Sequence, residues 1–97
     1  MPRKLKIPEL NNKNFPYPLV KIYWEDIVSN NSWEDIIDIK KSKTAICCSI
    51  GWLVTQNSNV TIIMSDFSFE DNNQIKQGGN YTTIPTKNVL SIKKFKI

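Results

Sequence analysis

The chain has 97 residues, of which 40% are hydrophobic and 10% aromatic, and its formal net charge at pH 7 is +4. This length suits one domain and this apolar content suits one compact core, which argues against a wholly disordered chain. No run reaches the roughly 18 apolar residues that span a bilayer, and no apolar run follows the first charges as it would in a signal peptide. We therefore expect a soluble, cytoplasmic protein without membrane contact.

The charge is distributed unevenly along the chain. Residues 24–39 contain five acidic residues and no basic one, whereas residues 72–97 contain five lysines and no acidic one. The first 23 residues carry five basic residues against Glu9 alone. Contact with a polyanion and head-to-tail pairing of subunits are both electrostatically reasonable. An ordinary solvated surface is the third possibility.

Residues 1–18 are predicted to form an extended, basic arm. Four prolines in this stretch block helix formation and sheet pairing. A partly disordered tail is the alternative for residues 1–8. Four apolar side chains of the arm could lie along the folded domain or along a neighbouring subunit, namely Leu5, Ile7, Phe15 and Tyr17.

Residues 19–24 are rich in β-branched and aromatic side chains and are predicted to be the first strand. The tetrapeptide Trp-Glu-Asp-Ile occurs at residues 24–27 and again at 33–36. The second copy is predicted to open a short helix, with Ser32 as N-cap and Asp35 three residues later as in a capping box. The buried face of this helix is expected to consist of Trp33, Ile36 and Ile37.

Residues 44–56 form the longest strand candidate. Gly51 in its middle indicates the bend or bulge with which small barrels turn a corner. The polar residues 56–59 supply turn chemistry, and residues 60–64 return as the next strand. These segments together predict a hairpin.

Residues 67–80 are predicted to be a loop with two turns, marked by Asp71-Asn72-Asn73 and by Gly78-Gly79. A short strand, a tight turn and the last strand follow at residues 81–84, 85–87 and 88–95. Five short strands, one helix and no alternation of strands with crossover helices indicate a mainly β protein. We expect residues 19–97 to form a single domain, a five-stranded, strongly bent barrel of the Sm-like or SH3-like kind.

Two motifs in the second half of the chain carry a family resemblance. The first contains Gly51, Leu53, Asn57, the mainly apolar residues 60–64 and Asp66, and the second contains Ile84, Pro85-Thr86, Lys87, Asn88 and the mainly apolar residues 89–92. In this order they resemble the paired motifs of the Sm/LSm family. The resemblance implies a homo-oligomeric ring of about five to seven subunits, in which residues 81–84 of one subunit pair with residues 88–95 of the next. It also implies binding of single-stranded RNA or DNA and a role in nucleic-acid processing.

The family holds uridine with an aromatic or histidine side chain, an asparagine and an arginine. The matching positions of this chain carry Asn59, Thr61 and Pro85. Because Asn59 cannot stack on a base, we expect a polar pore in place of the standard uridine pocket, with phosphates neutralised by lysine. The candidate nucleic-acid-binding residues are Asn57, Ser58, Asn59, Thr61, Thr86, Lys87 and Asn88.

The chain contains 13 basic residues, and all but Arg3 are lysines, a bias typical of AT-rich genomes. The proline-rich arm, the extra segment at residues 25–42 and the Trp-Glu-Asp motif look similar to small uncharacterised Sm-like proteins of marine phages. This similarity implies a phage product that acts in the cytoplasm of a bacterial host.

A protein-interaction or virion-assembly adaptor with an SH3-like barrel is the alternative function, because exposed aromatic residues anchor interfaces. Its candidate contacts are Tyr23, Trp24, Trp33 and Trp52, for which core packing is the simpler interpretation.

An enzyme is the weakest alternative, because the chain has no histidine and its paired acids suit a solvated surface. The adjacent Cys47 and Cys48 point to opposite faces of a strand and are predicted to be reduced. We therefore expect no catalytic residues, no metal site, no cofactor and no small-molecule substrate.

Overall fold

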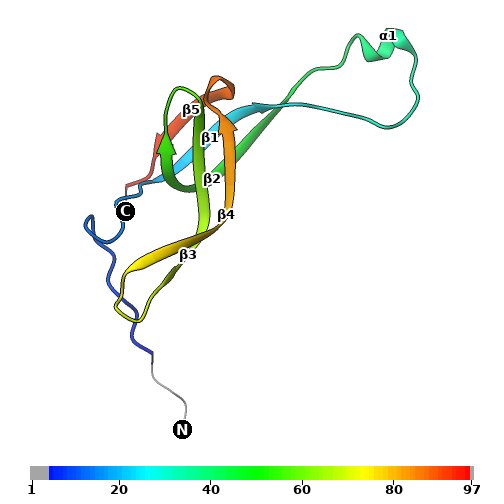
Figure 1. The fold of residues 1–97 in the computed structure, drawn as a ribbon. Helices are drawn as coiled ribbons and strands as arrows, with labels where there is room; N and C mark the ends of the chain where they lie inside the picture. Colours follow the sequence, from blue (N-terminus) through cyan, green and yellow to red (C-terminus); the bar gives the residue numbers. More distant parts are fainter. Residues whose placement is uncertain (1–4, 97) are drawn as a thin grey trace.

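A computed structural model describes residues 5–96 of the chain. The first four residues of the predicted arm and the last residue of the predicted domain lie outside the described residues. Figure 1 shows one antiparallel sheet with the strand order β4-β3-β2-β1-β5. The elements are β1 (Leu19–Asp26), α1 (Ile36–Ile39), β2 (Ala45–Gln56), β3 (Val60–Phe69), β4 (Ile75–Pro85), the 3-10 helix η1 (Thr86–Asn88) and β5 (Val89–Lys94).

The prediction of a mainly β protein with five strands and one short helix is confirmed. Every strand pairing among the described residues is antiparallel, and β4 and β5 form the two edges of the sheet. Because these two edges do not pair with each other in the described part of the chain, the sheet is open. Closure into a barrel stays a prediction.

The core lies on the inner face of the curved sheet. Val20 and Ile22 alternate with more exposed residues along β1, as expected for a strand with one buried face. They pack with Ile63 of β3 and Ile84 of β4, and all four are buried. Three half-buried side chains pack against this cluster, namely Trp24, Leu53 and Val89.

The arm contributes an aromatic cluster at one end of the sheet. Phe15 is only 7% exposed, and its ring lies 4.3 Å from that of Phe67 and 5.7 Å from that of Trp52, measured between centroids. Tyr17 contacts Phe15 edge to face at 5.2 Å. Aromatic pairs at these distances contribute beyond the area they bury. The arm residues around Phe15 are therefore part of the packed structure.

Gly51 lies buried where β2 passes close to β3. A Cβ atom at this position would come within 2.8 Å of the backbone oxygen of Met64 and 3.2 Å of Cβ of Ile63. The register of the β2–β3 pairing shifts just beyond it, between Leu53 and Thr55. A glycine followed by a bulge fits the sharp curvature expected of this strand.

The predicted loop at residues 67–80 is wrong except at residues 70–74. β3 continues to Phe69 and β4 begins at Ile75, so only the first of the two predicted turns is present. Gly78 pairs with Phe67 inside the ladder. A Cβ atom at Gly78 would collide with the sulfur of Met64, so the methionine side chain would have to move. Gly78 therefore serves close packing between strands, whereas Gly79 has open space beside it. The predicted short strand at residues 81–84 is part of a strand of 11 residues.

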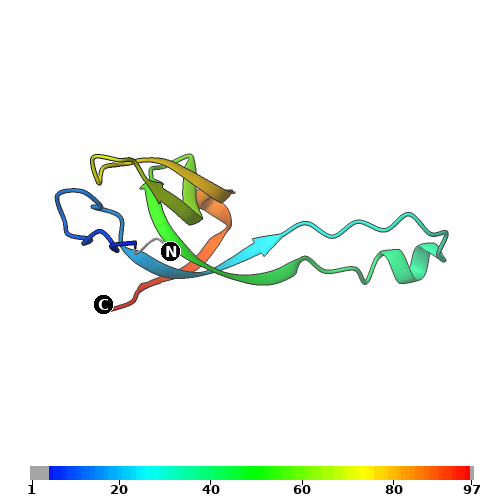
Figure 2. The ribbon, with the colours of Figure 1, turned by 90° about the horizontal axis from the view of Figure 1, so that it is seen from below.

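The predicted helix is also shorter and far more exposed than expected. α1 spans four residues, its N-cap is Asp35 without a side-chain hydrogen bond, and the hydroxyl of Ser32 bonds Asn30 instead. Trp33 is 101% exposed, and Ile36 and Ile37 are exposed as well. The predicted buried face is wrong because the chain between β1 and β2 runs out as a long hairpin, which no other element of residues 5–96 covers (Figure 2).

This hairpin makes the molecule elongated. The Cα radius of gyration is 18.9 Å, against about 12.5 Å for a compact chain of this length.

None of the helices in residues 5–96 has the length and apolarity to cross a membrane.

Candidate nucleic-acid interface

Two turns that are distant in sequence meet at one end of the sheet. The turn between β2 and β3 is held by Asn57, whose side-chain oxygen accepts the backbone N–H groups of Asn59 and Val60, both at 2.8 Å. The backbone N–H of Asn57 donates to the carbonyl of Val60 at 2.9 Å. These bonds are those of an Asx turn, which is why asparagine suits this corner.

Thr86 joins the second turn to the first. Its backbone N–H donates to the carbonyl of Asn59 at 3.1 Å, and its hydroxyl donates to the carbonyl of Asn57 at 2.7 Å. The hydroxyl of Thr61 lies 3.0 Å from that of Thr86. Because Thr86 has one hydroxyl proton and gives it to Asn57, Thr61 is the donor in this pair.

Thr61 occupies the bottom of this arrangement. Its side chain is fully buried, and its hydroxyl also accepts a hydrogen bond from Nε2 of Gln56 at 3.3 Å. A fully buried hydroxyl does not face solvent, so Thr61 holds Thr86 in place and leaves surface contacts to its neighbours. The structure thus brings together four of the sequence-predicted residues, which are Asn57, Asn59, Thr61 and Thr86.

Of the other predicted residues, Ser58 and Lys87 are exposed beside these turns. Asn88 is half-buried and donates from Nδ2 to the backbone carbonyl of Glu25 at 3.1 Å. It therefore ties η1 to β1 and does not join the Asn57–Thr86 group through this bond. The exposed surface of the group offers amide and hydroxyl groups and one ammonium, which can contact phosphates and base edges.

A second basic surface lies on β1 and β5, and the sequence analysis missed it. Lys21 of β1 pairs in register with Lys93 of β5, and Nζ of Lys21 lies 5.5 Å from the centre of the Tyr23 ring. Tyr23 is 41% exposed. Strand alternation places Lys21 and Tyr23 on the same face, a signal that was readable in the sequence, whereas the pairing with Lys93 depends on the strand order.

A hollow of about 230 Å³ adjoins this surface. It is lined by Phe95 and by four lysines, which add positive charge: Lys21, Lys93, Lys94 and Lys96. Lysines next to an exposed aromatic ring are the combination with which proteins bind single strands without sequence preference. We call the residues Lys21, Tyr23, Lys93, Lys94 and Lys96 the lysine face, a name for the surface around this hollow and not for one side of the sheet, because Lys94 pairs with the buried Val20.

Within residues 5–96 no three His, Cys, Asp or Glu side chains are grouped as metal ligands would be. Cys47 is half-buried, Cys48 is exposed, and both are free thiols.

Comparison with known proteins assigns no family. No protein-family model, no curated protein and no solved structure matches the chain. The functional argument therefore depends on the strand order and on the chemistry of the two surfaces described above.

Proposed function

We propose that the chain is an Sm-like protein that assembles into a homo-oligomeric ring and binds single-stranded RNA or DNA. The observation that carries this proposal is the strand order, in which β4 and β5 are the free edges of one curved sheet. A free edge presents unpaired N–H and C=O groups that another chain can pair with. Pairing of β4 of one copy with β5 of the next copy covers both edges, and repetition of this contact closes a ring.

The charges and amides favour a nucleic acid as the ligand of the ring. The turns around Asn57 and Thr86 present amides, hydroxyls and Lys87, and the lysine face adds four ammonium groups per subunit. Lysine binds phosphate as a mobile point charge and lacks the planar fork with which arginine reads guanine. We therefore infer salt-dependent binding with weak sequence selectivity, which suits a role in nucleic-acid processing.

Two measurements test this proposal. Light scattering should give a solution mass of about five to seven times the 11.2 kDa of one chain, and a monomer at all concentrations rejects the ring. Filter binding at low and high salt should retain single-stranded oligonucleotides at low salt only. Absence of retention at low salt rejects nucleic-acid binding, whatever the mass is.

A second candidate function is a protein-interaction or virion-assembly adaptor with an SH3-like barrel, in keeping with the proposed phage origin. The observation that favours it is the projecting hairpin, which exposes Trp33 completely. Exposed tryptophans are frequent anchors of protein interfaces. Recovery of the protein in purified phage particles supports this function, and its absence from them favours the nucleic-acid function.

A further inference from the structure

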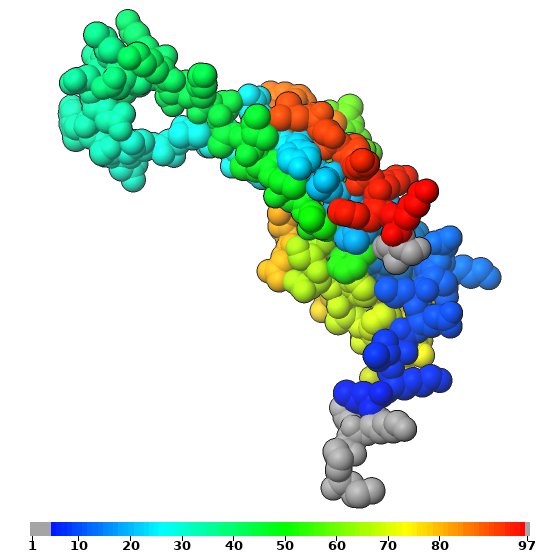
Figure 3. All heavy atoms as spheres, turned by 180° about the vertical axis from the view of Figure 1, so that it is seen from behind, coloured from blue at the N-terminus to red at the C-terminus, as the bar shows by residue number. Residues whose placement is uncertain are grey.

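The end of the β1–β2 hairpin is an apolar surface without cover. Figure 3 shows it standing clear of the sheet. Its large side chains are exposed by half or more, with Trp33 wholly so. We call residues 33–39 the hairpin tip, and its exposed apolar residues are Trp33, Ile36, Ile37 and Ile39.

The whole chain exposes more surface than a compact monomer of its mass would. The accessible surface is 8480 Å², whereas a folded monomer of this mass exposes about 5,700 Å². The excess is larger than the roughly 800 Å² that each partner buries in a stable interface. Contiguous apolar surface of this kind on a soluble chain marks an interaction site.

The charge of the tip restricts the chemistry of that partner. Glu34, Asp35 and Asp38 lie between the apolar residues, and residues 27–39 contain no basic residue. The lysines at 40, 41 and 43 follow only on the return segment. The tip is therefore an acidic, apolar segment that ends in one turn of helix, and its complement is an apolar groove with a basic rim.

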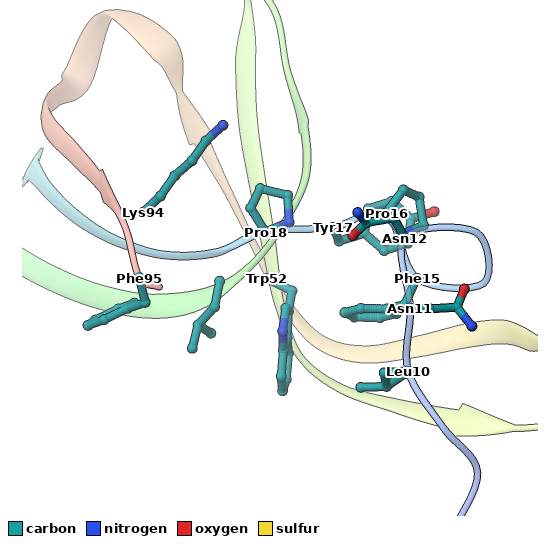
Figure 4. A pocket seen from close by; sticks show the side chains of 11 residues that line it. Leu10, Asn11, Asn12, Phe15, Pro16, Tyr17, Pro18, Trp52, Lys94 and Phe95 are labelled. Carbon is teal, nitrogen blue, oxygen red and sulfur yellow. The ribbon is translucent and has the colours of Figure 1, made fainter. Parts of the chain in front are cut away.

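A groove with this chemistry lies at the other end of the same molecule. It has a volume of about 580 Å³, within the range of about 300–1,000 Å³ typical of binding pockets. Figure 4 shows Trp52 between Phe95 on one side and Leu10 and Phe15 on the other. Lys94 also lines the groove, and it is shared with the adjoining hollow of the lysine face. Among the described residues that line these two hollows, none is acidic.

We propose that the hairpin tip of one copy docks into this groove of a second copy. A molecule cannot fill its own groove, because the hairpin points away from the arm and the two lie at opposite ends of a molecule 65 Å long (Figures 1 and 3). The apolar residues of the tip are buried against Trp52, Phe95 and Leu10. Its carboxylates approach Lys94 at the rim and the further lysines of the adjoining hollow.

This contact joins two different surfaces, so it is heterologous. Each copy that fills a groove leaves its own groove open to a third copy, and the contact propagates until it closes on itself. It uses side chains of the tip and the groove and does not use the backbone groups of the β4 edge. The docking and the edge pairing therefore use different groups of the chain, and they adjoin at Lys94, which lines the groove and is also the last residue of β5.

A binding experiment with complementary variants tests the docking. The immobilised protein is the Trp33→Ser variant, which has an intact groove and an altered tip. Two analytes are passed over it. The Leu10→Glu variant has an intact tip and an altered groove, and the double variant Leu10→Glu/Trp33→Ser has neither surface intact. Both positions are exposed enough to spare the fold, and circular dichroism checks this. We expect the single variant to bind at least tenfold more tightly than the double variant.

Two controls complete the experiment. Ile46 is an exposed apolar residue on β2 outside the tip, and adding Ile46→Ser to the Leu10→Glu analyte should leave binding unchanged. Adding Lys94→Glu to the immobilised chain should weaken binding. Equal binding of the single and double variants overturns the proposal and assigns the tip to a different partner. Edge pairing contributes equally to both analytes, so the outcome does not depend on the proposed ring.

Discussion

The hydroxyl groups of Thr61 and Thr86 lie 3.0 Å apart, although 25 positions separate the two residues in the chain. Thr61 is the donor in this pair, because Thr86 gives its proton to the carbonyl of Asn57. The buried Thr61 therefore depends on Thr86 for its acceptor. Thr86 is only half-buried, so water can reach it if Thr61 is changed. Substitution of Thr86 should therefore destabilise the fold more than substitution of Thr61.

We expect Thr86→Val to lower the free energy of unfolding by about 1–3 kcal/mol, because it leaves a buried donor without an acceptor. Thr61→Val should lower it by about 1 kcal/mol or less, because valine fills the same space and water can satisfy Thr86. In the double variant the loss should be smaller than the sum of the single losses. Urea unfolding followed by tryptophan fluorescence measures all three.

Thr82→Val, at an exposed position on β4, is the matched control and should change stability by less than about 0.5 kcal/mol. If Thr61→Val is as destabilising as Thr86→Val, the assigned direction of the hydrogen bond is wrong.

The glycines of the sheet should differ in their tolerance of alanine. At Gly51 a Cβ meets backbone oxygen at 2.8 Å, whereas at Gly79 the nearest atom lies at 4.0 Å. Backbone cannot move aside as a flexible side chain can, so Gly51→Ala should destabilise the fold by about 1–3 kcal/mol. Gly79→Ala should have an effect of about 0.5 kcal/mol at most. Thermal unfolding of the two variants compares them, and equal losses of stability would contradict the close approach at Gly51.

The sheet was predictable where side-chain patterns are local. The β-branched and aromatic residues at 19–24 and the turn asparagines after Gln56 predict β1 and the β2–β3 hairpin correctly. The pair Gly78-Gly79 predicts a turn wrongly, because glycine occurs both in turns and at positions where two strands lie close together. The distinction depends on the side chain of Met64, which lies 14 residues away from Gly78 in the sequence.

The exposure of the hairpin was not predictable, because its sequence is that of an ordinary amphipathic helix. Trp33, Ile36 and Ile37 have the spacing of a buried face, and only the absence of a covering element among residues 5–96 leaves them in solvent. The β1–β2 pairing begins at Leu19 opposite Trp52 and ends at Asp26 opposite Ala45. Because the pairing is this long, the segment that connects the two strands points away from the sheet.

The candidate site was predictable in part. Asn57 and Thr86 belong to turns with strong local signals, and the family resemblance predicts that the two turns form one site. The lysine face was missed because Lys21 and Lys93 are 72 positions apart, and only the β1–β5 pairing makes them neighbours. The position of Thr61 in a motif predicts that it binds nucleic acid, but the motif does not indicate that its side chain is buried.

The arm should contribute to stability through Phe15. This side chain is 7% exposed and contacts the rings of Tyr17, Trp52 and Phe67. Phe15→Ala should therefore lower the free energy of unfolding by about 3 kcal/mol, as expected for truncation of a buried phenylalanine. Leu5→Ala, at an exposed position of the same arm, should change it by less than about 0.5 kcal/mol. Similar values for both variants in urea unfolding would show that the arm does not stabilise the sheet.

The proposed ring depends on the β4 edge. Tyr81 is exposed on β4, and the β5 edge that it would face in a neighbouring copy carries Lys93 and Lys94. Tyr81→Lys places like charges across that contact, which disfavours strand pairing. We expect the solution mass measured by light scattering to fall towards that of a monomer, whereas Tyr81→Phe should keep the mass of the unchanged protein. An unchanged mass for Tyr81→Lys would exclude this edge from the assembly.

The salt dependence of binding should identify the lysines that touch phosphate. Lys87 is exposed next to the Asn57–Thr86 group, so Lys87→Gln should weaken binding of single-stranded oligonucleotides of every sequence. It should also reduce the slope of log K against log salt by about 0.7. Lys76→Gln is the matched control, since Lys76 lies near the β3–β4 turn, apart from both candidate surfaces. Fluorescence anisotropy over a salt series measures these slopes, and equal slopes for the two variants would place the phosphate contacts on the lysine face alone.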